Sequence, residues 1–388
     1  MTHPLLRLSI SCLAIAALAA GCASAPRDES RKPATGGTTP VDYFINQAHC
    51  LSADAPSFDP KASSFSISNA YWLGILSRVS YAPESEAVET ARTLGFQDVE
   101  FLDVTHARIK SEADETLGEK ARRALEAHEN KQPSYYGSTQ ALWAEGPDYA
   151  VLAFRGTDFD GLSDVMTDID AGRQIEVPHL GRVHEGFLQA VELGWKWIKE
   201  HADRLGPDKK LFITGHSLGG ALATLATGML LEEDRAAVQA GKQAPYRIAG
   251  SYSFASPRIG NAEFVREILE DYRSAQGHGR KVVAARFMNP EDAVTMVPTK
   301  ARLSNIPYAS DMSDLVYFTD DHGMLTGAQA VKTAPPHLIS LLRDKRKIVG
   351  WWHDSYYLSQ HSMERYLYNL SRQLDLDKDA CIPEENRN

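Results

Sequence analysis

Basic charge, cysteine and long apolar runs are all scarce in this chain of 388 residues. Its 41 Lys and Arg are outnumbered by 51 Asp and Glu, so the formal net charge is −10. No stretch of the sequence forms a basic stripe. Nucleic acid is therefore not an expected partner, because proteins that bind it concentrate Lys and Arg on one face. No segment repeats at a fixed period, which argues against a repeat architecture. The remaining composition, 43% hydrophobic and 24% charged, is typical of a soluble globular protein with an ample core.

One apolar run, Leu8 to Ala20, follows Arg7 near the N-terminus. Its thirteen residues are too few for a transmembrane helix, which needs about 20, but suit the hydrophobic region of a signal peptide. The run ends in the sequence LAAGC, which resembles a bacterial lipobox, so we expect residues 1–22 to be a signal peptide with Cys22 as the lipidation site. We therefore expect a lipid-anchored protein of a bacterial cell envelope. Transport to the outer membrane is expected to be possible because no aspartate follows Cys22. The alternative is a secreted or periplasmic protein, cleaved after the small residues Ala23 to Ala25.

The four cysteines divide into two pairs by position. Cys12 would leave with the signal peptide and Cys22 would carry lipid, so Cys50 and Cys381 remain in the mature chain. In an oxidising compartment they are candidates for a disulfide, and two free buried thiols are the alternative. Residues 23–40 are polar and rich in Pro, Gly and Thr, which predicts a flexible tether between the lipid and a domain at residues 41–388.

Strand and helix patterns alternate through the rest of the chain, which predicts an α/β fold with a largely parallel sheet. From Thr299 to Val349 the patterns are weak, and the sequence indicates no role for this stretch. Charged residues at Glu232–Ala244 predict a polar loop. The predicted helices are Ser68–Ser80, Ala87–Leu94, Glu112–Asn130, Glu185–Leu205 and Glu263–Arg273, and the predicted strands are Val99–Val104, Thr139–Ala144, Tyr149–Arg155, Leu211–Thr214, Arg247–Phe254 and Lys281–Asn289.

The stretch LFITGHSLGGALATLAT, residues 211–227, has the pattern of a buried strand, a tight turn and a helix of small residues. A Gly-x-Ser-x-Gly sequence in that context indicates a nucleophile elbow with Ser217 at its apex. Small residues two before and two after the serine let strand and helix approach each other. The alternative interpretation is a Gly-rich turn in which Ser217 caps the following helix.

Five motifs in a fixed order carry a resemblance to a known family. The chain resembles the class 3 lipases over roughly residues 68–370, which implies an α/β-hydrolase fold, a serine carboxylic-ester hydrolase and no metal or organic cofactor. The resemblance also predicts a short lid at Phe159–Val165. The motifs are FRGT (154–157), VHEGF (183–187), GHSLGG (215–220), FASPRIGN (254–261) and NPEDAVTMVP (289–298).

A serine nucleophile needs a general base and a carboxylate that orients the base. The chain order Ser, acid, His of α/β-hydrolases places the acid after Ser217, at the end of a strand. Asp292 follows the strand ending at Met288 and matches the carboxylate position of the family's motif, with the adjacent Glu291 as competitor. His361 is the predicted base, because HSMERYLYNL is similar to the family's histidine followed by a tyrosine-bearing helix, and His353 is the second candidate.

The predicted oxyanion hole has two donors. The N–H of Leu218, the residue after the nucleophile, supplies one by geometry, and Thr157 supplies the other by resemblance. Five aspartates between residues 158 and 170 could suggest calcium, but Gly161 is misplaced for an EF-hand loop, so no metal site is predicted.

The expected partners are a lipid or other ester substrate and the membrane that holds the anchor, and the sequence indicates no oligomeric state. The predicted function is hydrolysis of lipid esters, as by a triacylglycerol lipase. A phospholipase A1 or a short-chain esterase with the same triad, or a catalytically silent lipid-anchored binding protein, are the alternatives.

Overall fold

A computed structural model of the chain describes residues 57–105, 138–157, 169, 173–268, 282–289, 292–298, 314–318, 324–326 and 360–374. These residues all belong to one compact unit, Pro40–Asn388. Several predictions lie outside the described residues, namely the signal peptide with Cys22, the tether, Cys50 and Cys381, the helix at 112–130 and the candidate lid.

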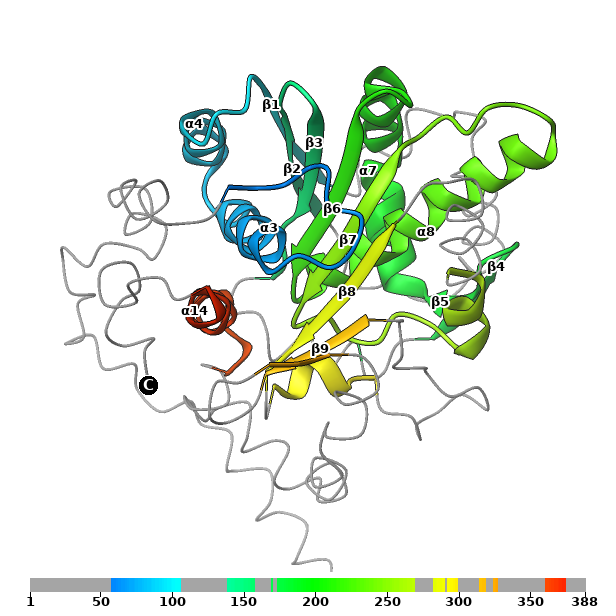
Figure 1. The fold of residues 1–388 in the computed structure, drawn as a ribbon. Coiled ribbons are helices and arrows are strands. Elements are labelled where there is room, and N and C mark those ends of the chain that lie inside the picture. The colour runs from blue at the N-terminus through cyan, green and yellow to red at the C-terminus, as the bar shows by residue number, and fades with distance from the viewer. Residues whose placement is uncertain are drawn as a thin grey trace, which may run out of the picture. The chain divides into compact units, whose positions relative to one another are not determined.

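An eight-stranded sheet forms the centre of this unit (Figure 1). The neighbours from β3 to β9 run parallel, whereas β1, β2 and β3 pair antiparallel at one side and β9 pairs antiparallel with β10 at the other. The predicted fold, a mainly parallel central sheet flanked by helices, is confirmed. In their order across the sheet the strands are β1 (Asp98–Thr105), β2 (Ser138–Glu145), β3 (Tyr149–Phe154), β6 (Lys210–His216), β7 (Ile248–Phe254), β8 (Val283–Met288), β9 (Asp314–Phe318) and β10 (Met324–Thr326).

Helices cover both faces of the sheet, because successive side chains of each central strand point to opposite faces and are buried on both. In β6, for example, Phe212 packs into one apolar cluster and Ile213 into the other. The cluster around Ile213 is covered by α7 (Glu185–Leu205) and α8 (Leu218–Gln239). The cluster around Phe212 is covered by α3 (Ile67–Val79), α4 (Glu84–Thr93) and α14 (Met363–Gln373).

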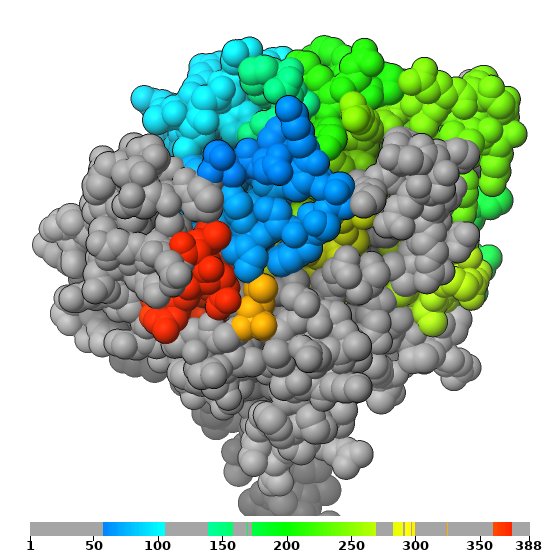
Figure 2. Space-filling model, viewed as in Figure 1, coloured from blue at the N-terminus to red at the C-terminus, as the bar shows by residue number. Residues whose placement is uncertain are grey.

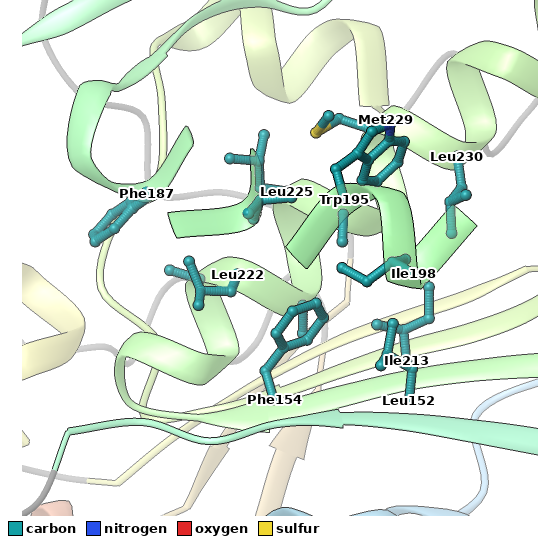
Figure 3. Packing of buried hydrophobic residues seen from close by; sticks show 14 of the residues in the cluster. Leu152, Phe154, Phe187, Trp195, Ile198, Ile213, Leu222, Leu225, Met229 and Leu230 are labelled. Carbon is teal, nitrogen blue, oxygen red and sulfur yellow. The ribbon is translucent and has the colours of Figure 1, made fainter. Parts of the chain in front are cut away.

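The face under α7 and α8 is packed by large side chains. Figure 3 shows Leu152 and Phe154 of β3 together with Ile213 of β6 on the sheet side, and Ile198 of α7 and Leu222 of α8 facing them. All five side chains are less than 2% exposed. Burial of each such side chain contributes about 1.5–3 kcal/mol, so this layer holds the strand and helix that flank Ser217 in place.

On the other face, α3 and α14 lie side by side although nearly 300 residues separate them (Figures 1 and 2). Their approach depends on Gly74, where a Cβ would lie 3.0 Å from side-chain atoms of Leu367 and Met363. An ion pair between Arg78 of α3 and the buried Glu364 of α14 joins the same two helices. The beginning of α14 is thereby held beside the end of α3.

The polar loop predicted at Glu232–Ala244 is wrong for most of its length, because α8 continues to Gln239. Asp234 is buried and accepts the backbone N–H of Tyr246, so its charge serves a tertiary contact. Glu, Asp and Arg are compatible with a helix, and the chain leaves the helical path near Gly241, whose φ is 73°.

Three features were not predicted. A two-stranded sheet of β4 (Gln174–Val177) and β5 (Gly181–His184) precedes α7, and the strands β9 and β10 lie within the weakly patterned region 299–349. A short 3-10 helix, η2 (Ala293–Met296), follows Asp292. Among the helices in the described ranges, none has the length and apolarity needed to cross a membrane.

Candidate active site

Ser217 occupies a sharp turn between β6 and α8 with φ 58° and ψ −128°, a backbone conformation that residues with side chains rarely adopt. Glycine is required on both sides of it. A Cβ on Gly215 would lie 2.2 Å from the backbone oxygen of Gly219, and a Cβ on Gly219 would lie 2.3 Å from the oxygen of Phe154. Ser217 stands at the N-cap position of α8, but its side chain makes no capping bond, in contrast to the alternative interpretation from the sequence.

The hydroxyl of Ser217 is hydrogen-bonded to the imidazole of His361 instead. The distance from Ser217 Oγ to His361 Nε2 is 2.9 Å, and His361 Nδ1 lies 3.0 Å from Oδ1 of Asp292 and 3.2 Å from its Oδ2. The three side chains, separated by up to 144 residues along the sequence, thus form one continuous chain of hydrogen bonds. All three residues are buried, between 1% and 3% exposed.

The hydrogen bonds to Asp292 and Ser217 fix the tautomer of His361. An ionised carboxylate only accepts, so Nδ1 carries the proton and donates it to Asp292. With the proton on Nδ1, Nε2 carries the lone pair that accepts from the hydroxyl of Ser217. This is the arrangement in which an imidazole can take the proton of a serine hydroxyl.

Local structure presents the carboxylate of Asp292. The residue caps η2, because its Oδ1 accepts the N–H of Val294 at 3.0 Å. Its Oδ2 accepts the hydroxyl of Tyr366 at 2.7 Å, and that hydroxyl in turn accepts the N–H of Asn289 at 2.9 Å. Burial and then the adjacent Asp292 carboxylate hold the pKa of Tyr366 well above its ordinary value, so the phenol stays a donor.

Asn289 connects the chain segment that carries Asp292 to the segment that carries His361. Its Nδ2 donates to the backbone oxygen of Gln360 at 2.8 Å, and its Oδ1 accepts from Nδ2 of Asn369 at 2.8 Å. The sequence reasoning missed Tyr366 and Asn289. The signals that could have found them are the tyrosine in the helix after His361 and the asparagine that opens the NPEDAVTMVP motif.

The predicted oxyanion residues lie on either side of the turn. Leu218 is the first residue of α8, where a backbone N–H has no acceptor within the helix, and the N-terminus favours negative charge. Thr157 follows β3, whose last residue, Phe154, pairs with Gly215. A Cβ on the intervening Gly156 would lie 3.2 Å from that of Ser217, so this loop runs directly beside the serine.

His216 also lies in this site, where its ring faces the backbone of His361. The competitors named from the sequence, Glu291 and His353, lie outside the described residues. Within the described part of the chain, no group of three or more His, Cys, Asp or Glu side chains could hold a metal ion.

Comparison with known proteins finds similarity to one family over part of the chain. Residues 151–301 match the family "Lipase (class 3)", which confirms, over that stretch, the resemblance indicated by the five motifs. The chain is 29% identical over 151 residues to triacylglycerol lipase OBL1 of Arabidopsis thaliana, and the match covers 29% of this chain and 28% of that protein. It is 26% identical over 259 residues to toxin TseL of Vibrio cholerae, covering 58% of this chain and 37% of the toxin.

The chain therefore spans well under half the length of these two relatives. Among solved structures, Lip2 lipase from Yarrowia lipolytica aligns with a TM-score of 0.41 at 18% identity, covering 64% of this chain and 77% of that one.

Proposed function

We propose that this chain, whose residues 151–301 match the class 3 lipase family, is a serine hydrolase that cleaves carboxylic esters of lipids. The observation that carries the proposal is the hydrogen-bonded line from Ser217 through His361 to Asp292. In the proposal Ser217 is the nucleophile, His361 the general base and Asp292 the carboxylate that orients the base.

The first half of the reaction forms an acyl-enzyme. As Ser217 Oγ attacks the ester carbonyl carbon, His361 Nε2 takes the hydroxyl proton, and Asp292 stays ionised against Nδ1–H and stabilises the imidazolium. The carbonyl oxygen becomes an oxyanion, for which the N–H groups of Leu218 and Thr157 are the proposed donors. The tetrahedral intermediate collapses, the ester C–O bond breaks, and His361 returns the proton to the departing alcohol.

The second half removes the acyl group by the same route. Water gives a proton to His361 Nε2 while its oxygen attacks the acyl carbon, and collapse of the second intermediate returns the proton to Ser217 Oγ and releases the carboxylic acid. One base thus serves both halves, because Nε2 faces the serine and Nδ1 remains bonded to Asp292 throughout.

Acylglycerols are the proposed substrates, since a similar protein is named a triacylglycerol lipase. The lipobox-like sequence supports the further proposal that Cys22 carries lipid and holds the enzyme at a bacterial envelope membrane.

The test is ester hydrolysis by the wild type and by Ser217→Ala, with p-nitrophenyl esters from acetate to palmitate and a fluorophosphonate probe. We expect turnover and labelling in the wild type, and a loss on the order of 10⁴-fold or more in Ser217→Ala, because an alanine cannot form the acyl-enzyme. The control is Ser85→Ala, which changes an exposed serine of α4 and should leave both readouts unchanged.

The preferred chain length would separate a lipase from a short-chain esterase, and a phosphatidylcholine substrate would reveal a phospholipase. Equal activity of Ser217→Ala and the wild type would contradict the assignment of the nucleophile. A folded wild type that neither turns over any of these esters nor reacts with the probe would leave the catalytically silent binding protein as the better explanation.

A further inference from the structure

A second buried histidine contacts the proposed base through its backbone. His216 Nε2 lies 2.6 Å from the backbone oxygen of His361, and His216 Nδ1 lies 2.9 Å from the hydroxyl of Tyr81. The two imidazole rings are 4.8 Å apart between centroids. The proposed reaction uses no proton of His216, so its burial beside the base needs a separate explanation.

Hydrogen-bond chemistry fixes the proton on His216. A backbone carbonyl only accepts, so Nε2 must carry the proton that the oxygen of His361 receives. Burial and then the nearby His361 keep the pKa of His216 well below 6.5, so the ring is neutral and its Nδ1 accepts the hydroxyl proton of Tyr81. Because Nε2 is committed to the carbonyl, His216 is not available as the base for Ser217.

Tyr81 is itself held at the end of α3. The guanidinium of Arg155 stacks over its ring at 5.7 Å from the centroid. Its hydroxyl also lies against Gly156, where a Cβ would come within 2.2 Å of it. A directed chain of hydrogen bonds therefore runs from Tyr81, beside the loop of Thr157, through His216 to the backbone of His361.

This chain supplies a second point of attachment for His361. Asp292 holds Nδ1 of its ring, whereas His216 holds the carbonyl oxygen, which lies just before α14 begins at Met363. With ring and backbone both held, the direction of Nε2 toward Ser217 is set. We propose that His216 is a positioning residue that fixes the backbone of His361 and so aims the base at Ser217, with Tyr81 orienting His216; this rests on the function proposed above.

Two substitutions of similar size separate the two nitrogens of His216. In His216→Gln, the side-chain amide N–H lies about where Nε2 of the histidine lay and can still donate to the backbone oxygen of His361. His216→Asn places its amide at the reach of Nδ1, toward Tyr81, and loses the donor to His361. We expect His216→Asn to lower kcat by up to about a hundredfold with little change in KM, because a small misplacement of the base is costly, and His216→Gln to recover most of that loss.

Proton NMR of the His361 Nδ1–H gives a readout that does not depend on turnover. We expect this proton, shielded from exchange by its bond to Asp292, in the wild type and His216→Gln, and its loss or broadening in His216→Asn. If these spectra are obtained but the wild type hydrolyses no ester, the proposed function fails while the positioning role stands. Equal kcat and equal spectra for the Asn and Gln variants would overturn the positioning role.

Tyr81→Phe provides a second test should His216→Asn fold poorly, because it removes one hydroxyl from a half-buried side chain. Loss of that hydroxyl lets the His216 ring reorient, so kcat should fall several-fold without loss of the folded structure by circular dichroism. Where His216→Asn does fold, its double variant with Tyr81→Phe should show less than additive effects, since both changes act through one chain of hydrogen bonds. An unchanged kcat in Tyr81→Phe, or full additivity, would contradict the proposal.

Discussion

At the scale of the residue, three buried histidines show that partners, rather than burial, decide what an imidazole does. His361 faces a carboxylate and a hydroxyl, and His216 faces a carbonyl and a phenol. His184 caps α7 by accepting the N–H of Gly186 at 3.1 Å. Burial, opposed by a backbone hydrogen bond to Ile169, lowers the pKa of His184 to about 4. It is therefore a structural residue that must stay neutral.

Acid should destabilise the protein through His184. Its pKa in the folded state is below the unfolded value of 6.5, so the unfolded state binds the proton first as the pH falls. The stability it confers is complete above about pH 6.5 and is lost between there and about pH 4, in total about 3 kcal/mol. His184→Asn keeps an acceptor for Gly186 and does not titrate, so the difference in urea unfolding free energy between wild type and variant should shift by that amount between pH 7 and pH 4. A pH-independent difference would contradict the prediction.

At the scale of the element, α3 and α14 act as one support for the proposed base. α3 contributes Arg78 and leads directly into Tyr81, while α14 begins two residues after His361. In the Arg78–Glu364 ion pair the side chain of Glu364 is 7% exposed and that of Arg78 is 12% exposed, so little water is available to solvate either charge without the other. A change on α3 can therefore move the base without touching it.

Arg78→Met should be strongly destabilising, because it leaves the carboxylate of Glu364 buried without its partner, at a cost of about 3–5 kcal/mol. The double variant Arg78→Met with Glu364→Met should recover most of that loss. Urea denaturation measures the unfolding free energy of both variants. In the ester assay, kcat should be lower for Arg78→Met than for the wild type.

The matched control is Arg173→Met, which breaks the pair of Arg173 with Glu185, where the arginine side chain is 48% exposed. Exposed pairs contribute about 0–1 kcal/mol, so this change should have little effect. If Arg78→Met costs no more than Arg173→Met, the Arg78–Glu364 pair does not support α14 as described.

At the scale of the whole molecule, the acidic chain joins a folded unit, Pro40–Asn388, to an N-terminal segment whose composition predicts a signal peptide, a lipidated Cys22 and a tether. The sheet places Ser217 and the ends of β3 and β7 together, because parallel neighbours end at the same edge. The proposed anchor would hold the folded unit at a membrane, and the proposed chemistry would belong to the folded unit alone.

Cys22→Ala tests that division in a bacterial host. The full-length variant should no longer incorporate labelled palmitate or fractionate with membranes. It should still hydrolyse esters in detergent at the wild-type rate, since Cys22 takes no part in the proposed triad. Cys12→Ala, which changes a cysteine inside the predicted signal peptide, should remain lipidated. Continued lipid labelling of Cys22→Ala, or no labelling of the wild type, would refute the anchor.

Much of the architecture follows from local sequence. The apolar run before Gly215, the glycines around Ser217 and the amphipathic stretch 185–205 specify a strand, a sharp turn and a helix through short-range sterics and periodicity. Where local signals conflict, the prediction failed, as at residues 232–239, whose charged side chains suit either an exposed loop or a helix. The hydrogen bond from the backbone N–H of Tyr246 to the carboxylate of Asp234 favours the helix at these residues.

The site divides in the same way. The sequence alone determined the strained turn at Ser217. Its resemblance to the class 3 lipases then pointed to Asp292 and His361 as the partners of Ser217, with Glu291 and His353 as the competing candidates. Only the tertiary structure decided that His361 Nε2 meets Ser217, that Tyr366 and Asn289 hold the acid, and that His216 holds the backbone of His361. The reason is physical: sterics and periodicity act over a few neighbouring residues, whereas these hydrogen bonds join atoms up to 145 positions apart and exist only once the sheet and α14 have packed.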